Sequence, residues 1–227
     1  MITIKEGAVF IADAHYPHHG DELIKVLKDI KQNKIKTTQL FLMGDIFDIL
    51  FDNHKVLLKY NHQAINLIND LSLDIEIHYI EGNHDFLLQN IFPKVKVYPY
   101  KQQPIKASLL NKSISLAHGD NYDTGFLYQI YTHLIRNRYI LKSIYIFDTF
   151  LLKYFFDKLP QKHICNKFIN FENKVQKILS NYQADIIIEG HFHQGKQINR
   201  YISLPSLACQ KQIAIVQNAQ INFINIK

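Results

Sequence analysis

Five short polar motifs hold most of the side chains in this chain that could do chemistry. They are DAH, GDIFD, GNHD, HGD and GHFH, and they begin at residues 13, 44, 82, 118 and 190. Their ligand-type side chains are two carboxylates, four imidazoles and one amide, namely Asp13, Asp45, His15, His118, His191, His193 and Asn83. Such a mixture of oxygen and nitrogen ligands favours Mn²⁺, Fe or Zn²⁺, whereas Ca²⁺ prefers oxygen alone.

The number and spacing of these ligands predict two ions. Seven ligands exceed what one such ion needs, and two ions that share Asp45 would use them all. A two-metal centre is a common device for displacement at phosphorus. In D-x-H and H-x-H, residues two apart point the same way from an extended chain, so both could reach one ion. A single pair of this kind is more often a surface pair or a cap, but all five motifs together favour a metal site.

The apolar segments before the motifs predict where these side chains lie. Buried strands are expected at 8–15, 38–45, 73–85 and 184–191, and helical spacing appears at 21–32 and 55–71. Strands that alternate with helices predict a sheet with helices on its faces. Ligands of such folds bind beyond the carboxyl ends of the strands, so we expect the motifs to converge at one edge.

The sequence pattern changes after residue 95. Short strands are expected up to the HGD motif, with a turn at Asn111-Lys112, and a helical stretch follows at 126–180, broken near Pro160. The tail is expected to form antiparallel strands, with a turn at Asn218-Ala219. We interpret 1–227 as a single α/β domain with a helical insertion at 121–180.

Composition sets the broad class of protein. The 227 residues are 47% hydrophobic and 20% charged, as in globular proteins, and the net charge is +6. This charge indicates either anionic partners or surplus surface lysine. Cys165 and Cys209 have no metal or redox spacing, which favours a reducing cytoplasm. The apolar run near the N-terminus is too short for a signal peptide, so we expect a cytoplasmic protein.

The order of the motifs resembles that of the calcineurin-like metallophosphoesterases, over most of the chain. The resemblance implies a four-layer fold, a β-sandwich flanked by helices, and a dinuclear metal centre. One ion would be held by Asp13, His15, Asp45 and either His191 or His193; the other would be held by Asp45, Asn83, His118 and the remaining histidine. Water activated by the ions would attack phosphorus. His84 would stabilise the developing charge or protonate the leaving oxygen, and Asp48 or Asp85 would either orient His84 or serve as caps.

Longer matches narrow the substrate. GDIFDIL, GNHDFLL and HGDNYDT resemble the UDP-2,3-diacylglucosamine diphosphatases of lipid A synthesis, which carry an acyl-binding lid between the last two motifs. The resemblance implies hydrolysis to UMP and 2,3-diacylglucosamine 1-phosphate, with Mn²⁺ as the expected metal. This chain departs from that family in having His84 where its best-known branch has Arg, and in a shorter lid. The alternatives are a phosphodiesterase or nuclease, and a non-catalytic scaffold, although scattered lysines argue against nucleic acid.

Residues 139–156 could be a membrane span, a core helix or part of the lid. Lys142, Asp148 and Lys153 disfavour a span, because each charge would cost about 2.5–3.5 kcal/mol in a bilayer core. The broad apolar arc and basic stripe favour a lid helix that covers acyl chains at the inner-membrane surface. The expected substrate contacts are Asn83, His84, Asp120, Arg136 and Arg138.

Overall fold

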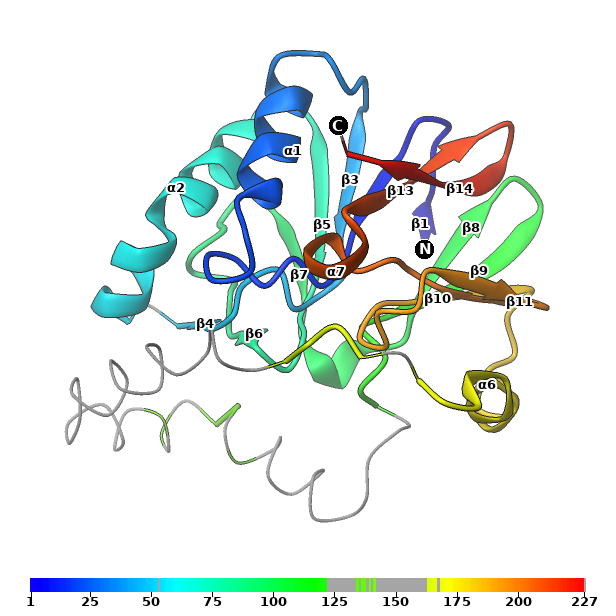
Figure 1. The fold of residues 1–227 in the computed structure, drawn as a ribbon. Helices are drawn as coiled ribbons and strands as arrows, with labels where there is room; N and C mark the ends of the chain where they lie inside the picture. Colours follow the sequence, from blue (N-terminus) through cyan, green and yellow to red (C-terminus); the bar gives the residue numbers. More distant parts are fainter. Residues whose placement is uncertain are drawn as a thin grey trace.

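Two six-stranded sheets form the centre of the protein, as Figure 1 shows for the computed structural model. The structure describes residues 1–52, 54–121, 134, 136–137, 139, 141, 163–166 and 168–226. Most of the insertion expected at 121–180, including all of the lid helix at 139–156 except Tyr139 and Leu141, therefore lies outside the described residues. Within the described residues no helix is long and apolar enough to cross a bilayer.

The first sheet has the strand order β14-β13-β2-β3-β5-β7. Its parallel half alternates with helices, as the sequence predicts: β2 (Val9–Ile11), β3 (Gln39–Leu42), β5 (Glu76–Ile80) and β7 (Lys96–Tyr98). Antiparallel pairing adds β13 (Gln212–Gln217) and β14 (Gln220–Asn225). Asn218 and Ala219 turn between these two with φ of 53° and 58°, so the predicted tail hairpin is confirmed.

The second sheet has the strand order β1-β8-β9-β10-β12-β11. Its strands are β1 (Ile2–Thr3), β8 (Ile105–Leu109), β9 (Lys112–Ala117), β10 (Ile186–Glu189), β11 (Lys196–Ile198) and β12 (Tyr201–Ser203). The turn between β8 and β9 lies at Leu110 and Asn111, one residue before the predicted position. The expectation of antiparallel strands was wrong for β12 with β10, because these two pair in parallel.

Alternating side chains assign the two faces of each sheet. Phe10 of β2 faces the core between the sheets, where it stacks on Phe41 at 4.5 Å, while Val9 and Ile11 face the helices. In the second sheet Ile188 faces the same inner core, and Ile187 faces an outer cluster. Both sheets are therefore covered on two sides, which explains why their strands are almost wholly apolar.

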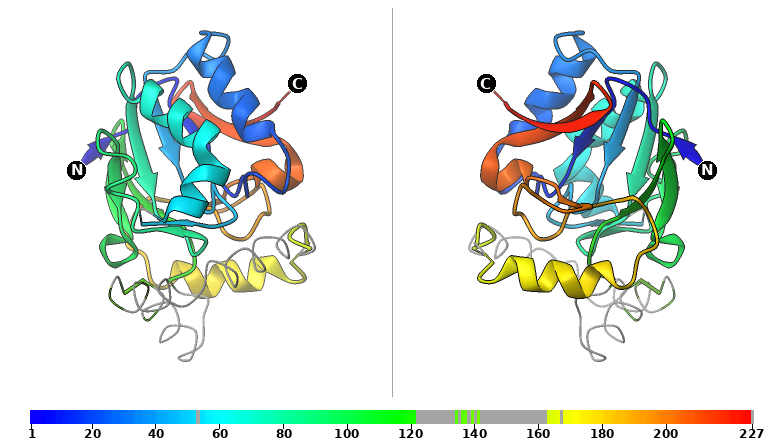
Figure 2. Two further views of the ribbon diagram at one scale, coloured as in Figure 1. Left: turned by 90° about the vertical axis from the view of Figure 1, so that its left-hand side faces the viewer. Right: turned by 90° about the vertical axis from the view of Figure 1, so that its right-hand side faces the viewer.

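Helices cover the outer faces of the sandwich (Figure 2). Helices α1 (Glu22–Lys31) and α2 (Lys55–Leu71) bury one apolar face against the first sheet, and both match the predicted ranges closely. Helix α6 (Phe171–Leu179) contributes Phe171, Val175 and Ile178 to the cluster on the second sheet. The predicted arrangement of a β-sandwich flanked by helices is confirmed. Short elements complete the described fold: β4 (Leu50–Phe51), β6 (Asp85–Phe86), η1 (Tyr100–Gln102) and α7 (Leu207–Gln210).

Candidate metal centre

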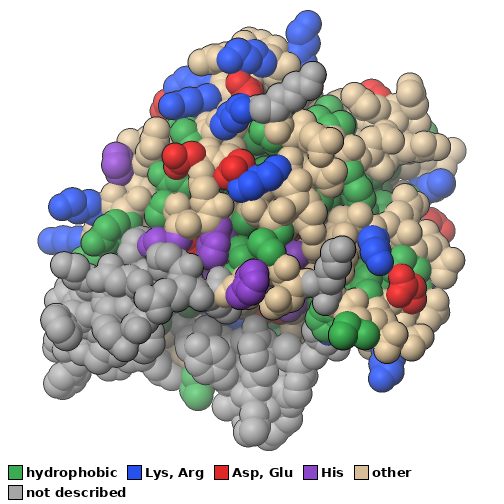
Figure 3. Space-filling view, viewed as in Figure 1, with side chains coloured by type: hydrophobic (Ala, Val, Ile, Leu, Met, Phe, Trp, Pro, Cys, Tyr) green, Lys and Arg blue, Asp and Glu red, His purple; other side chains and the backbone are tan. Residues whose placement is uncertain are grey.

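The five polar motifs follow five strand ends. DAH follows β2, GDIFD follows β3 and GNHD follows β5 in the first sheet; HGD follows β9 and GHFH follows β10 in the second. These strands run parallel within each sheet, so the motifs meet at one edge of the sandwich. Histidine side chains gather in a band across the middle of the face that Figure 3 shows.

Six of the seven expected ligands fall into two groups. Group A is Asp13, His15 and His193; group B is Asp45, His118 and His191. Within each group, one ligand atom from each residue lies within 4.8 Å of the others. The sequence left open which histidine of GHFH belongs to which group, and the geometry puts His193 with Asp13 and His191 with Asp45.

Group A has the polar atoms that a bound ion would need. Nε2 of His193 lies 3.3 Å from Oδ1 of Asp13, and the backbone N–H of His191 donates to the same oxygen at 3.0 Å. Oδ2 of Asp13 and both ring nitrogens of His15 are buried without a hydrogen-bond partner. Buried polar atoms are rarely left unpaired, so these lone pairs fit a divalent ion.

Group B is held from the interior of the sandwich. Nδ1 of His118 lies 3.0 Å from the carbonyl of Met43, and its backbone N–H donates to Oε1 of Gln103 at 2.8 Å. Nε2 of His118 then faces Oδ2 of Asp45 at 3.5 Å and Oδ1 of Asn83 at 3.2 Å. Asn83, the seventh expected ligand, thus lies beside this group. A carbonyl that fixes one ring nitrogen leaves the other as the metal ligand.

The electrostatics keep the ligands in forms that suit a cation. Burial would raise the pKa of Asp13, but the charge and hydrogen bond of His193 outweigh it and lower that pKa. His118 acts in the same way on the buried Asp45, whose pKa falls well below its usual range. Burial lowers the pKa of His191 to about 4, so its ring is neutral at pH 7. Two carboxylates and a neutral imidazole are therefore available to a metal.

The backbone at these ligands is unusual. Asp13, His15, Asp45, His191 and His193 all have positive φ, between 46° and 61°. The sequence argument assumed extended chain at D-x-H and H-x-H, and that assumption was wrong. Each pair instead lies in a left-handed turn just past its strand. Such conformations cost free energy in non-glycine residues and cluster at functional sites, because the surrounding structure has to hold them.

Asp85 supports the centre through the main chain. Its carboxylate accepts the backbone N–H groups of Asp45, Ile46, Phe47 and Gly82 at 2.7–3.2 Å, and the hydroxyl of Tyr79 at 2.7 Å. Its bonds thus join the GDIFD and GNHD loops. Asp85 was expected either to orient His84 or to serve as a cap. Its bonds to backbone N–H groups are those of a cap.

Asp48 is surrounded by the histidines of the first loop. Its carboxylate accepts the backbone N–H of His18 at 2.9 Å and lies 2.7 Å from that ring, 3.6 Å from His15 and 3.7 Å from His19. The side chains of His18 and His19 are only 14% and 16% exposed, because they pack against this carboxylate. The bond to Nδ1 of His84 comes from the Asp48 main-chain carbonyl, at 2.7 Å, rather than from its carboxylate.

Arg136 joins the insertion to the site. Its Nη2 donates to the carbonyl of Gly82 at 2.8 Å and lies 3.2 Å from Oδ2 of Asp120, and its guanidinium stacks on Tyr100 at 4.3 Å. Its Nε and Nη1 are buried without a hydrogen-bond partner. Of the expected substrate contacts, Asn83, His84, Asp120 and Arg136 thus lie along one side of the centre, and Arg138 lies outside the described residues.

A disulfide and a buried glutamine support the site without having been predicted. Cys165 and Cys209 form a disulfide, although their spacing in the sequence predicts neither a metal site nor a redox pair. The residues are 44 apart in sequence, and no motif links them. Gln103 braces His118, but a lone glutamine after a short apolar strand carries no sequence signal. Only the fold brings these side chains to the ligands.

Comparison with known proteins places the chain among phosphoesterases. The family described as calcineurin-like phosphoesterase matches residues 8–195. The UDP-2,3-diacylglucosamine hydrolase of Photorhabdus laumondii is 24% identical, with 82% of this chain and 81% of that protein covered. The protein of that name from Histophilus somni is 27% identical, with 82% and 83% covered. The Blochmanniella floridana protein of that name is 26% identical, with 86% and 83% covered.

Proposed function

The chain belongs to the calcineurin-like phosphoesterase family, and from this premise we propose that it hydrolyses the pyrophosphate bond of UDP-2,3-diacylglucosamine. The products would be UMP and 2,3-diacylglucosamine 1-phosphate. The single observation that carries the reaction class is the pair of ligand groups, A and B, at the meeting point of five strand ends. The relatives at 22–27% identity over about four-fifths of the chain support the substrate.

The two groups suit attack of water at phosphorus. Two divalent ions, for which we propose Mn²⁺, would neutralise phosphoryl charge and lower the pKa of a bound water. Group A is open enough for substrate, because its His193 side chain is 11% exposed, whereas His118 of group B is fully buried. Group B would thus be the inner ligand group and group A the outer one, both beside the same phosphate.

His84 is the residue best placed to act on the leaving oxygen. Its backbone N–H donates to Oδ1 of Asp45 at 2.9 Å, and its Nδ1 is held by the Asp48 carbonyl, which directs Nε2 away from both bonds. Its ring lies 5.2 Å from that of His15. We assign Nε2 of His84 to stabilise charge on the phosphate or to donate a proton to the leaving group.

The remaining substrate would lie beside Asp120 and Arg136. A guanidinium with two unpaired nitrogens, Nε and Nη1, is suited to a second phosphoryl group. The acyl chains would contact residues 139–156, a proposal that rests on the apolar sequence of that segment. We further propose that the protein works at the cytoplasmic face of the inner membrane, where such a substrate presents its headgroup.

The test is direct product analysis. Purified chain supplied with Mn²⁺ should release UMP and the lipid 1-phosphate in equal amounts from UDP-2,3-diacylglucosamine, as measured by mass spectrometry. Asp45→Ala should abolish release, because Asp45 contributes to group B and also lies next to group A through the His15 N–H bond to its carbonyl. Asp74→Ala, which removes an exposed carboxylate after α2, is the matched control.

Two outcomes separate the parts of this proposal. Turnover of bis(p-nitrophenyl) phosphate without UMP release would overturn the substrate and leave the reaction class. Full activity of Asp45→Ala on either compound would overturn the metal-dependent mechanism. Release of nucleotides from DNA or RNA would instead favour the nuclease alternative.

A further inference from the structure

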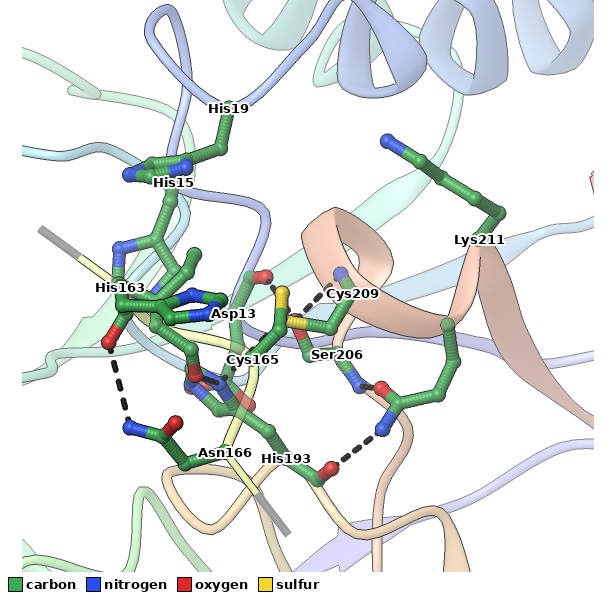
Figure 4. Close-up of a disulfide and its surroundings, with 12 residues drawn as sticks. Asp13, His15, His19, His163, Cys165, Asn166, His193, Ser206, Cys209 and Lys211 are labelled. Atoms are coloured by element: carbon green, nitrogen blue, oxygen red, sulfur yellow. Dashed lines mark hydrogen bonds and ion pairs between the residues drawn. A yellow bond between two sulfur atoms is a disulfide. The ribbon is translucent and has the colours of Figure 1, made fainter. Parts of the chain in front are cut away.

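The disulfide Cys165–Cys209 lies directly against group A (Figure 4). Its Cys209 sulfur is 3.8 Å from Nδ1 of His193, and the residue before Cys165 supplies the hydrogen-bond acceptor of that same nitrogen. We propose that this disulfide is a redox-sensitive brace of group A, which holds His193 in the form and position that bind metal. This inference rests on the metal-dependent function proposed above.

The first step is the bond from His193 to the chain after the insertion. Nδ1 of His193 lies 2.9 Å from the carbonyl of Ile164 and therefore carries the proton that this carbonyl accepts. The other nitrogen, Nε2, lies 3.3 Å from Oδ1 of Asp13 and is the one whose lone pair a metal ion would take in place of a proton. A carbonyl in this place fixes the tautomer of a histidine ligand, and loss of such partners typically weakens metal binding about 10–100-fold.

The second step is the hold that α7 has on Asp13. Oγ of Ser206 donates to the Asp13 carbonyl at 2.8 Å and accepts the backbone N–H of Cys209 at 3.1 Å. The backbone N–H of Ala208 donates to the same carbonyl at 3.1 Å. Gln210 donates from its side chain to the carbonyl of His193. Helix α7 thus contacts both Asp13 and His193, and the disulfide joins it to Cys165, the residue after Ile164.

The third step concerns the hydrogen bonds that hold residues 163–166 to the rest of the described protein. Among the described residues, the hydrogen bonds of this segment to the rest of the protein go to His193 and to Gln194. Cys165 is exposed, and its bond to Cys209 closes a Cα–Cα distance of 5.4 Å. Once that bond is broken, the hydrogen bonds that remain between this segment and other described residues are the one from His193 to Ile164 and the 3.4 Å bond from Gln194 to Asn166.

Group B has a different kind of support. His118 also gives Nδ1 to a carbonyl, but that carbonyl belongs to Met43 at the end of β3, inside the sandwich. Met43 is fully buried, and its backbone N–H donates to the carbonyl of Ile11 in the neighbouring strand at 2.8 Å. Breaking the disulfide should therefore weaken group A and leave group B unchanged.

The redox step is thiol–disulfide exchange with a dithiol. A thiolate of the dithiol attacks the exposed Cys165 sulfur, the bond between the two cysteines breaks, and Cys209 leaves as a thiolate that takes a proton. The second thiol then attacks the mixed disulfide, which releases Cys165 as a thiol and the dithiol as a cyclic disulfide. Two electrons and two protons pass to the protein. Disulfides in reducing compartments are usually transient or redox-sensing. A redox-sensing role agrees with the position of this disulfide beside a metal ligand.

The test measures bound metal. Full-length chain is purified without reductant, and half of it is reduced with dithiothreitol and desalted under nitrogen. Both halves are then titrated with Mn²⁺, and the bound metal is measured by mass spectrometry. We expect one of the two Mn²⁺ ions to bind about 10–100-fold more weakly to the reduced chain. Cys165→Ser, an exposed position outside the ligand set, should show the same weakening without any reductant, and dithiothreitol should not change it further.

The outcomes separate this inference from the function on which it rests. Equal affinity for both ions in oxidised chain, reduced chain and Cys165→Ser would overturn the brace and leave the proposed function. Two free thiols in the unreduced chain would also overturn the brace alone. A chain that binds no Mn²⁺ in either redox state would overturn both. Far-UV circular dichroism of Cys165→Ser checks that the variant is folded, and Gln220→Ala, an exposed change on β14, controls for substitution itself.

Discussion

Groups A and B contain the same kinds of ligand and differ in what holds them. His118 of group B is fully buried and is fixed by Met43 and Gln103 from inside the sandwich. His193 of group A lies at the surface side and depends on Ile164 and α7. The comparison teaches that one half of a two-metal site can be a property of the sheets, while the other half depends on contacts from the chain beyond the insertion.

The largest effect is expected when one histidine ligand is removed from each group in turn. His118→Ala and His193→Ala should each lower turnover about a thousandfold, equal to about 4 kcal/mol of transition-state stabilisation. Only His118→Ala should also lower the free energy of unfolding of the metal-free chain, by about 2 kcal/mol, because the buried carbonyl of Met43 loses its partner. Urea unfolding in EDTA measures this, with the exposed His62→Ala as control. Equal destabilisation by both variants would contradict the comparison.

A smaller effect should follow from the polar surroundings of group A. Asp48→Asn removes a carboxylate that lies 3.6 Å from His15, so one Mn²⁺ should bind about 10–100-fold more weakly. The second ion, at group B, should bind as in the wild type. Titration with Mn²⁺ resolves the two affinities. Weakening of both ions to the same degree would show that the groups are not supported separately.

The same residue gives a pH dependence of stability. Burial would raise the pKa of Asp48, but the nearby ring of His15 and the hydrogen bonds of His18 lower it to about 2 from 3.8. A lowered carboxylate pKa contributes stability above pH 3.8, and that stability is lost as pH falls through 2. The free energy of unfolding of the metal-free wild type should therefore exceed that of Asp48→Asn by about 2 kcal/mol at neutral pH, and this difference should disappear toward pH 2. Asp70→Asn, at an exposed carboxylate, should show little such gap.

The smallest expected effect tests the core support of group B. Gln103→Ala leaves the buried N–H of His118 and the carbonyl of Glu81 without their partners, at a cost of about 1–2 kcal/mol in the free energy of unfolding. The neighbouring Gln102→Ala is exposed and should change little. Thermal unfolding of both variants makes the measurement. An unchanged Gln103→Ala would mean that the sandwich holds His118 without this side chain.

Local pattern was enough to predict the helices and the strands that carry the motifs. Helices α1 and α2 agree with the predicted ranges to within two residues, because the apolar spacing that indicates them is local in the sequence. The five motifs sit at strand ends for the same reason. The turn before β9 was predicted one residue late. Leu110 adopts a positive φ, and leucine is not a residue type that predicts such a turn.

Residue type and order thus determined that this chain carries seven metal-type ligands, where its strands end and which family it resembles. Tertiary structure decided which histidine joins which group, which atoms Asp48 and Asp85 bind, and that Cys165 meets Cys209. The physical reason is range. Periodicity and motif spacing report on neighbours along the chain, whereas the left-handed turns at Asp13 and His193 and their supports from α7 and Ile164 exist only once distant segments are packed together.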